Sequence, residues 1–178
     1  MKLIILAAAA LAGGAPAAGP SAPDPSTPMG AANAFYGAYL QSTAGAFPAE
    51  RARTRLRRLL SPNLNMLLEQ AEHAEAVHAW RTHGQQPPLI SGDVFTSLFE
   101  GAGRFQVQGC RADGMRAVCR IWLGGVGAGQ GPARWQDQLM LVRAPRGWVV
   151  DDVVYGASWP SANRGRLSRL LRSAIEGG

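Results

Sequence analysis

The chain has almost no lysine, only two cysteines and no long hydrophobic run. Its single lysine is Lys2, and the other 17 basic residues of the 178-residue sequence are arginines. No window approaches the roughly 20 apolar residues that a membrane-spanning helix requires, so we predict no stable membrane anchor. The sequence also shows no internal repeat, and a repeat architecture is therefore not expected.

The short motifs of common catalytic and metal sites are missing as well. Neither G-x-S-x-G nor S-x-x-K occurs, and the glycines between positions 124 and 131 lack the lysine of a phosphate-binding loop. His73, His78 and His83 are spaced five residues apart, which places them off a common helix face, and there is no H-E-x-x-H pair. We therefore expect no catalytic residue, no metal and no cofactor.

The first residues have the features of a secretory signal peptide. Lys2 precedes the apolar run from Leu3 to Leu11, and A-x-A-like cleavage sites follow in a stretch of small residues. We predict a signal peptide over residues 1–18, a flexible Pro/Ala-rich linker over 19–28 and a single domain over 29–178. The alternative is an uncleaved apolar N-terminal helix. The predicted location is periplasmic or secreted.

The formal net charge is +6. A basic exported protein attracts anionic partners such as acidic proteins, lipid head groups or wall polymers. Nucleic acid is not expected as a partner, because the arginines are spread along the chain. The densest group lies between Arg51 and Arg58, where helical spacing predicts a solvated face, with Leu56, Leu59 and Leu60 turned to the core.

The two cysteines, Cys110 and Cys119, suggest a disulfide in an exported chain. Both lie in segments of β-forming residues, and Asp113-Gly114 between them is typical of a hairpin turn. A tight Asp-Gly turn would place the cysteines diagonally, whereas a slightly longer turn or a bulge would place them opposite one another. Two reduced, buried thiols are the alternative.

The pattern of apolar residues changes once along the chain. Helical spacing predicts helices over residues 30–43, 49–60 and 61–82, the third with Ser61 as N-cap and Pro62 at its first position. Strand patterns follow at 104–110, 115–123, 134–143 and 147–155, and a short helix from Asn163 onward. This order predicts an α+β fold, in which N-terminal helices pack on a curved antiparallel four-stranded sheet.

Three strings resemble a known group of proteins: AFYGAYL in the first predicted helix, PPLISGDVFTSLFEG before the sheet and WVVDDVVY on the last strand. They look like a bacterial family of exported proteins and lipoproteins with a domain of unknown function. Over residues 30–172 the resemblance implies the cone-shaped, cystatin-like fold of nuclear transport factor two relatives. It implies no reaction, although some exported proteins with this cone fold are immunity proteins against secreted antibacterial toxins.

The carboxylates are the candidates for a pocket inside such a cone. Asp151 and Asp152 are neighbours in an otherwise apolar strand, so one of them should face inward. A buried carboxylate must be paired or hydrogen-bonded, here with an arginine or a tyrosine of the first helix, or it takes up a proton and can act as an acid or base. The pocket candidates are Asp151, Asp152, Asp137, Asp93, Tyr36 and Tyr39. Asp93 is alternatively placed to cap a short helix.

Contact with a partner is expected near the last strand and the final helix. Trp122, Trp135, Trp148 and Trp159 are expected to lie in the core or in pocket walls, and Trp159, which precedes Pro160, is the best candidate for exposure. We select Trp159, Arg164 and Arg166 as candidate partner contacts.

The sequence therefore predicts a noncatalytic exported domain that binds a partner protein. Its sharpest form is an immunity protein that neutralises an antibacterial toxin. One alternative is a small-ligand-binding or enzymatic pocket inside the cone, and another is a basic structural protein associated with the cell envelope. A homodimer is compatible with each of these hypotheses.

Overall fold

In the computed structural model, residues 23–42, 50–125 and 134–178 are described, and they build four helices and four strands. The predicted signal peptide, residues 1–18, lies outside the described residues, as do residues 19–22 of the predicted linker. The order is α1 (Pro28–Leu40), α2 (Glu50–Arg57), α3 (Pro62–Arg81), β1 (Arg104–Asp113), β2 (Arg116–Gly124), β3 (Trp135–Ala144), β4 (Gly147–Val154) and α4 (Leu167–Gly177).

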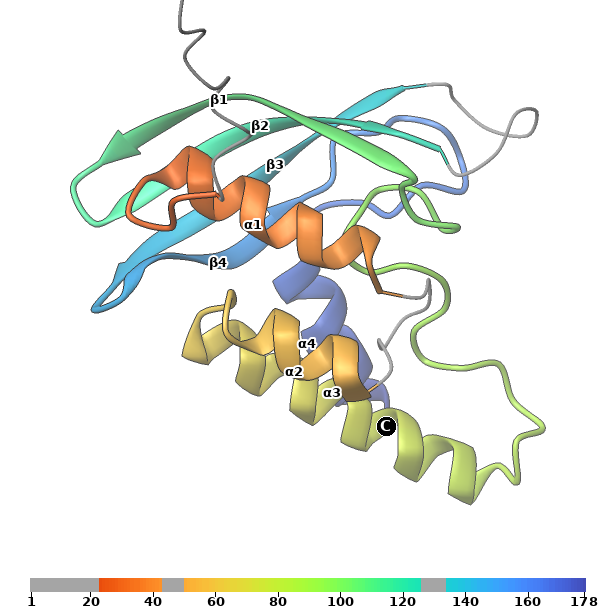
Figure 1. Ribbon diagram of the computed structural model, residues 1–178. Coiled ribbons are helices and arrows are strands. Elements are labelled where there is room, and N and C mark those ends of the chain that lie inside the picture. Colours follow the sequence, from red (N-terminus) through yellow and green to blue (C-terminus); the bar gives the residue numbers. More distant parts are fainter. Residues whose placement is uncertain (1–22, 43–49, 126–133) are drawn as a thin grey trace, which may run out of the picture.

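The four strands form an antiparallel meander in the order β1-β2-β3-β4. The four helices of the described residues all lie on one side of this sheet, and none of them covers its other face (Figure 1). The predicted α+β class and the four-stranded antiparallel sheet are therefore confirmed. β1 and β4 do not pair, so the sheet is open. The finer likeness to a nuclear transport factor two cone stays a prediction.

The core lies between the sheet and the helices, and α1 supplies its aromatic residues. Phe35 and Tyr36 are completely buried, and their rings contact Phe95 and Phe105 at centroid distances of 5.5 Å each. The facing side of β2 contributes alternate buried residues, which is the pattern of a strand with one covered face. Each buried ring contributes about 2–3 kcal/mol through loss of apolar surface from water.

Helix α1 begins at Pro28, two residues earlier than predicted. The Thr27 side chain accepts a hydrogen bond from Gly30 N (3.1 Å), which caps the helix at Pro28. The carbonyl of Pro25 accepts a hydrogen bond from Trp148 N (2.9 Å) on β4. Residues 24–28, predicted as the end of a flexible linker, are thus attached to the sheet.

The hairpin of β1 and β2 places Cys110 directly opposite Cys119, and the two form a disulfide. The predicted disulfide is therefore present. The loop consists of Gly114 and Met115, one residue later than the predicted Asp113-Gly114 turn, because Asp113 already pairs with Arg116. Gly114 has a φ of +55° and Met115 does not have a positive φ, and this combination is the pattern of a type II′ turn.

The outward edge of β4 is occupied by other parts of the chain. Besides Pro25, the connection between α2 and α3 pairs with it: Ser61 N donates to Val150 O (2.7 Å), and Val150 N donates to Leu59 O (2.8 Å). Further along, Tyr155 N donates to Gly165 O (3.1 Å). Among the described residues, nothing pairs in this way with the outward edge of β1.

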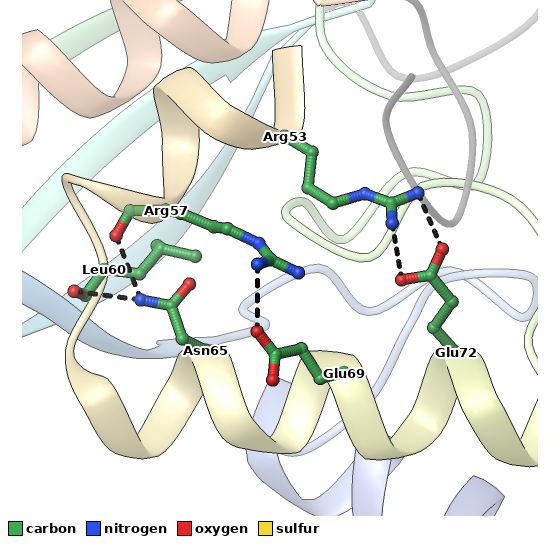
Figure 2. Close-up of polar contacts among 6 residues, drawn as sticks. All are labelled: Arg53, Arg57, Leu60, Asn65, Glu69 and Glu72. Carbon is green, nitrogen blue, oxygen red and sulfur yellow. Dashed lines mark hydrogen bonds and ion pairs between the residues drawn. The ribbon is translucent and has the colours of Figure 1, made fainter. Parts of the chain in front are cut away.

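Two ion pairs fasten α2 to α3 (Figure 2). Arg53 contacts Glu72 with both of its terminal nitrogens, at 2.6 and 2.8 Å, and Arg57 contacts Glu69 at 3.0 Å. We predicted a solvated arginine face on α2. In the structure, Arg53 and Arg57 instead form ion pairs with glutamates of α3. Such partly exposed pairs each contribute up to about 1 kcal/mol.

The C-terminal end of α2 is held by Asn65 of α3. Its side-chain amide donates to the carbonyls of Arg57 (2.9 Å) and Leu60 (3.4 Å), as Figure 2 shows. The carbonyls at the end of a helix have no partner within the helix, and the bond to Arg57 satisfies one of them, whereas the bond to Leu60 holds the connection to α3. The predicted core residues Leu56 and Leu60 are buried directly beside this contact.

Candidate docking face

Asp137, a predicted pocket residue, lies at the centre of a hydrogen-bond network in the core. Its side chain is 0 % exposed. One carboxylate oxygen accepts from Ser97 N (2.8 Å) and Trp135 Nε1 (3.1 Å), and the other from Ser97 Oγ (2.5 Å) and Gly156 N (2.9 Å). Burial raises the pKa of this carboxyl, and the hydrogen bonds partly offset the effect. The carboxylate therefore ties the segment before the sheet to β3 and to the end of β4.

Asp93 and Tyr39, two of the predicted pocket residues, contact one another inside the protein. Asp93 Oδ1 accepts from Phe95 N (2.9 Å), and its carboxyl also has hydrogen bonds with Tyr39 and Thr96. The bond to Phe95 N closes an Asx turn, and the short helix that Asp93 was expected to cap does not form. Burial raises the pKa of Asp93 to about 6. The Tyr39 hydroxyl accepts from Ala102 N (2.9 Å), and burial followed by the charge of Asp93 raises the pKa of Tyr39.

Two further tyrosines hold the same segment through their hydroxyls. Tyr36 donates to Phe95 O (3.4 Å), and Tyr155 of the β4 end donates to Val94 O (2.6 Å). Burial raises the pKa of both, so both hydroxyls keep their protons at any physiological pH. Tyr36 is therefore a hydrogen-bond donor in the core, and it does not contact Asp151 or Asp152 as one of our interpretations proposed.

Asp151 lies at a β-bulge, which changes the expected alternation of this strand. Met140 pairs with Asp152 and Leu141 with Val150, so Asp151 is an extra residue between the two pairs. Its Oδ1 accepts from Ser61 Oγ (2.6 Å), and the same Oγ accepts from Leu64 N (3.0 Å) as the N-cap of α3. Asp151 thus fixes the start of α3 against the sheet.

Asp152 does the same for α4. It is 7 % exposed, and its two oxygens accept from Ser168 N (3.0 Å) and Ser168 Oγ (2.7 Å) in the first turn of that helix. Arg166, the N-cap of α4, has no capping side chain, so the carboxylate of β4 replaces it. Arg166 Nη1 lies 3.7 Å from Asp152 Oδ2, which is the arginine contact that we expected for one of these aspartates.

The predicted partner contacts do not form an exposed aromatic patch. Trp159 is half-buried, with its ring edge-on to Trp135 at 5.8 Å, and Arg164 donates to its carbonyl (3.3 Å). The prediction that Trp159 is the most exposed tryptophan is wrong, because Trp80 at the end of α3 is 77 % exposed. Arg164 and Arg166 are exposed, but Arg166 already contacts Asp152.

The described helices leave the outer face of the sheet uncovered (Figure 1), and exposed arginines of β1 and β2, together with Arg134 just before β3, lie on that face. Side chains of β2 alternate between the core and this face. Residues of β1 and β3 that pair with an outward-facing residue of β2 lie on the same face. Among the described residues of β1 to β3, Asp113 at the hairpin end is the only acidic side chain on it. We call this surface the arginine face, after its five exposed members Arg104, Arg111, Arg116, Arg120 and Arg134.

One end of the arginine face is a hollow built around Trp122. The Arg134 guanidinium lies 4.5 Å above the centre of the Trp122 ring and donates to Gln106 Oε1 (3.2 Å). With Arg104 in its wall, the hollow has a volume of about 250 Å³. The ring and the amide therefore hold a cation in a defined position at the surface.

A second hollow lies further along the same face. It has a volume of about 450 Å³, and its lining includes Arg111, Arg120, Val118 and Gln138. Each hollow thus combines two arginines with one glutamine amide and an apolar wall. Guanidinium groups bind carboxylates with two parallel hydrogen bonds, so both hollows suit the carboxylates of a partner.

Sequence reasoning did not select any member of the arginine face. The signal was present as alternation, because Arg116, Val118, Arg120 and Trp122 occupy every second position of one strand. The arginines are not clustered along the chain. They form a charged face only because side chains at every second position of a strand point to the same side of the sheet. The contribution of β1 could not be read at all without the pairing register.

Comparison of this chain with protein-family models, with curated proteins and with solved structures finds no match. Within the described residues, no group of three or more His, Cys, Asp and Glu side chains could hold a metal ion. None of the helices in the described part of the chain combines the length and apolar character needed to cross a bilayer.

Proposed function

We propose that this protein is an exported, noncatalytic binding module that docks an acidic protein surface on its arginine face. The observation that carries the proposal is the collection of five arginines, with one aspartate among the described residues of β1 to β3, on the uncovered face of the sheet. Positive potential over such a face attracts an acidic partner and speeds its association. The disulfide and the predicted signal peptide support a location outside the cytoplasm.

A protein partner suits this face better than a phosphate polymer. The arginines alternate with half-buried Val118, Trp122, Met140 and Val142, which also lie on it. Arginine, tryptophan and methionine are enriched at protein interfaces, and apolar side chains between the charges serve a protein surface. The predicted pocket carboxylates support the noncatalytic part of the proposal, because each already accepts hydrogen bonds from the protein's own groups. Neutralisation of a secreted toxin remains the sharpest form of this hypothesis.

The test compares two charge reversals of equal size. The face variant is Arg111→Glu with Arg120→Glu, and the control is Arg169→Glu with Arg172→Glu, two exposed arginines of α4 on the helix side of the molecule. Binding of poly-L-glutamate, an acidic polypeptide probe, is measured by calorimetry at low and high salt, after thermal unfolding has shown that both variants fold.

We expect the face variant to lose at least about tenfold in affinity, which is a loss of about 1.4 kcal/mol. The control, which has the same net charge, should stay close to the wild type, and binding should weaken as salt rises. Equal losses in both variants would reduce the effect to net charge and contradict the proposal. Stronger binding of anionic vesicles or of heparin than of poly-L-glutamate would contradict a protein partner and indicate that the arginine face binds a membrane or a polyanion.

A further inference from the structure

We infer that the acidic partner is bound by strand addition, through an extended segment that pairs with the open edge of β1 beside the arginine face. The inference rests on the proposed function and names the form of its partner. Extended peptides that add to a sheet edge gain affinity from main-chain hydrogen bonds and specificity from alternate side chains.

The two edges of the sheet differ in how the chain treats them. The outward edge of β4 accepts and donates hydrogen bonds with Pro25, Leu59, Ser61 and Gly165. The ten-residue strand β1 has no such cover among the described residues. An uncovered edge of this length presents a row of backbone N–H and C=O groups, which is a template for another strand.

The disulfide shows which backbone groups point outward. The Cα atoms of Cys110 and Cys119 are 4.0 Å apart. This distance is nearer to the roughly 4.5 Å of a non-hydrogen-bonded pair in an antiparallel ladder than to the roughly 5.5 Å of a hydrogen-bonded pair. In such a pair the N–H and C=O point away from the neighbouring strand. Ala112, paired with Ala117 two residues further on, has the same orientation and an exposed side chain. Cys110 and Ala112 therefore offer their N–H and C=O groups to an added strand.

The usable part of the edge is its second half. A register shift leaves Gln108 as a bulge residue between the pairs of Val107 and Gly109, and a bulge interrupts a straight ladder. From Gly109 to Asp113 the pairing is regular, and the disulfide holds this half to β2. An added strand would therefore span about these five residues.

The chemistry of the added strand follows from what lies on each side of this half-edge. On the outer side its residues would meet Arg111 and the hollow lined by Arg111 and Arg120. Side chains of a strand alternate, so carboxylates are favoured at every second position, with uncharged residues between them. A second copy of the chain is a poor occupant, because antiparallel self-pairing over 109–113 is centred on Arg111 and sets two arginines opposite one another.

The test uses a blocked edge and a matched control. Proline at 112 removes the outward N–H without removing a bond to β2, and proline is tolerated on edge strands. We would compare Ala112→Pro with Ala112→Val, which keeps the N–H. The probe is the peptide Ac-Glu-Val-Glu-Thr-Glu-Val-Glu-NH2, titrated by amide-resolved NMR, together with the same peptide N-methylated at alternate residues.

We expect the largest amide shifts at Cys110 and Ala112, and at least about tenfold weaker binding for Ala112→Pro and for the methylated peptide. Ala112→Val should bind the peptide as the wild type does. Equal binding by the proline and valine variants, or by both peptides, would overturn strand addition, and the peptide comparison decides if the proline variant fails to fold. If strand addition fails in this way, but poly-L-glutamate still binds the wild type and not Arg111→Glu/Arg120→Glu, the proposed docking face is still supported. If Ala112→Pro binds the peptide and Arg111→Glu/Arg120→Glu binds poly-L-glutamate as tightly as the wild type does, both strand addition and the proposed docking face are contradicted.

Discussion

The replacement Asp137→Asn tests whether the buried carboxylate network supports the fold. Each Asp137 oxygen accepts two hydrogen bonds, one oxygen from Ser97 N and Trp135 Nε1 and the other from Ser97 Oγ and Gly156 N. An asparagine has the same shape but replaces one acceptor oxygen by an NH2 group. Whichever way the amide is turned, this NH2 group faces donors that lose their acceptor.

The magnitude follows from the number of bonds lost. A hydrogen bond to a charged group contributes about 1.5–3 kcal/mol, so two lost bonds lower the free energy of unfolding by about 3–6 kcal/mol. That is a large part of the roughly 5–15 kcal/mol that stabilises a typical domain. The same chemical change at exposed Asp113 should alter the free energy of unfolding by less than about 0.5 kcal/mol.

Urea unfolding followed by tryptophan fluorescence measures both variants. Trp135 donates to Asp137 and touches Trp159, so its emission reports on the network directly. A loss below about 1 kcal/mol for Asp137→Asn, or one equal to that of Asp113→Asn, would refute the reasoning, because it would mean that the four donors find other acceptors at little cost.

Three further predictions concern the helices and the pH. His83 ends α3 with a φ of +50° and donates its N–H to Trp80 O (3.3 Å), so His83→Gly should raise the free energy of unfolding by about 1 kcal/mol in urea titrations. Asn65→Asp should lower the free energy of unfolding by about 1–3 kcal/mol, because both amide donors are lost. The control Asn63→Asp, in the first turn of α3, should be neutral or stabilising. Equal effects of the two replacements would contradict the role of the Asn65 amide. The folded protein holds a proton on Asp93 up to pH about 6, against 3.8 for the ordinary carboxyl. Because the folded state binds the extra proton, stability is highest below pH 4 for this group and falls by about 3 kcal/mol as pH rises to 6, and Asp93→Asn should remove that slope from stability measured at successive pH values.

Local patterns were sufficient for much of the architecture. The Ser61-Pro62 start of α3 was predicted from two residues and is confirmed by the bond from Leu64 N to Ser61 Oγ. The aromatic face of the first helix and the meander of four strands were likewise predicted from periodicity. Such features depend on neighbours within a few residues, which is why they can be read from the chain alone.

The register of the hairpin was only partly predictable. The sequence indicated a bridge between Cys110 and Cys119, but the turn that sets them opposite lies one residue later than the Asp-Gly pair suggests. Moving a turn by one residue changes every residue pair in the hairpin. It therefore also changes which side chains are neighbours on each face of the sheet. The disulfide favours this register within the hairpin, and the pairing of the core residues of β2 with those of β3 fixes it against the rest of the sheet.

The roles of the aspartates were decided by tertiary structure. Asp151 and Asp152 looked like a pocket pair, yet a bulge lets them reach the starts of two helices that are distant in sequence. The arginine face has the same origin. Composition determined that this protein is basic and rich in arginine, and strand periodicity determined which arginines alternate with apolar residues. Only the pairing of three strands, with every helix on the opposite side, assembled them into one surface beside an open edge, because charges far apart in the chain become neighbours only through long-range contacts.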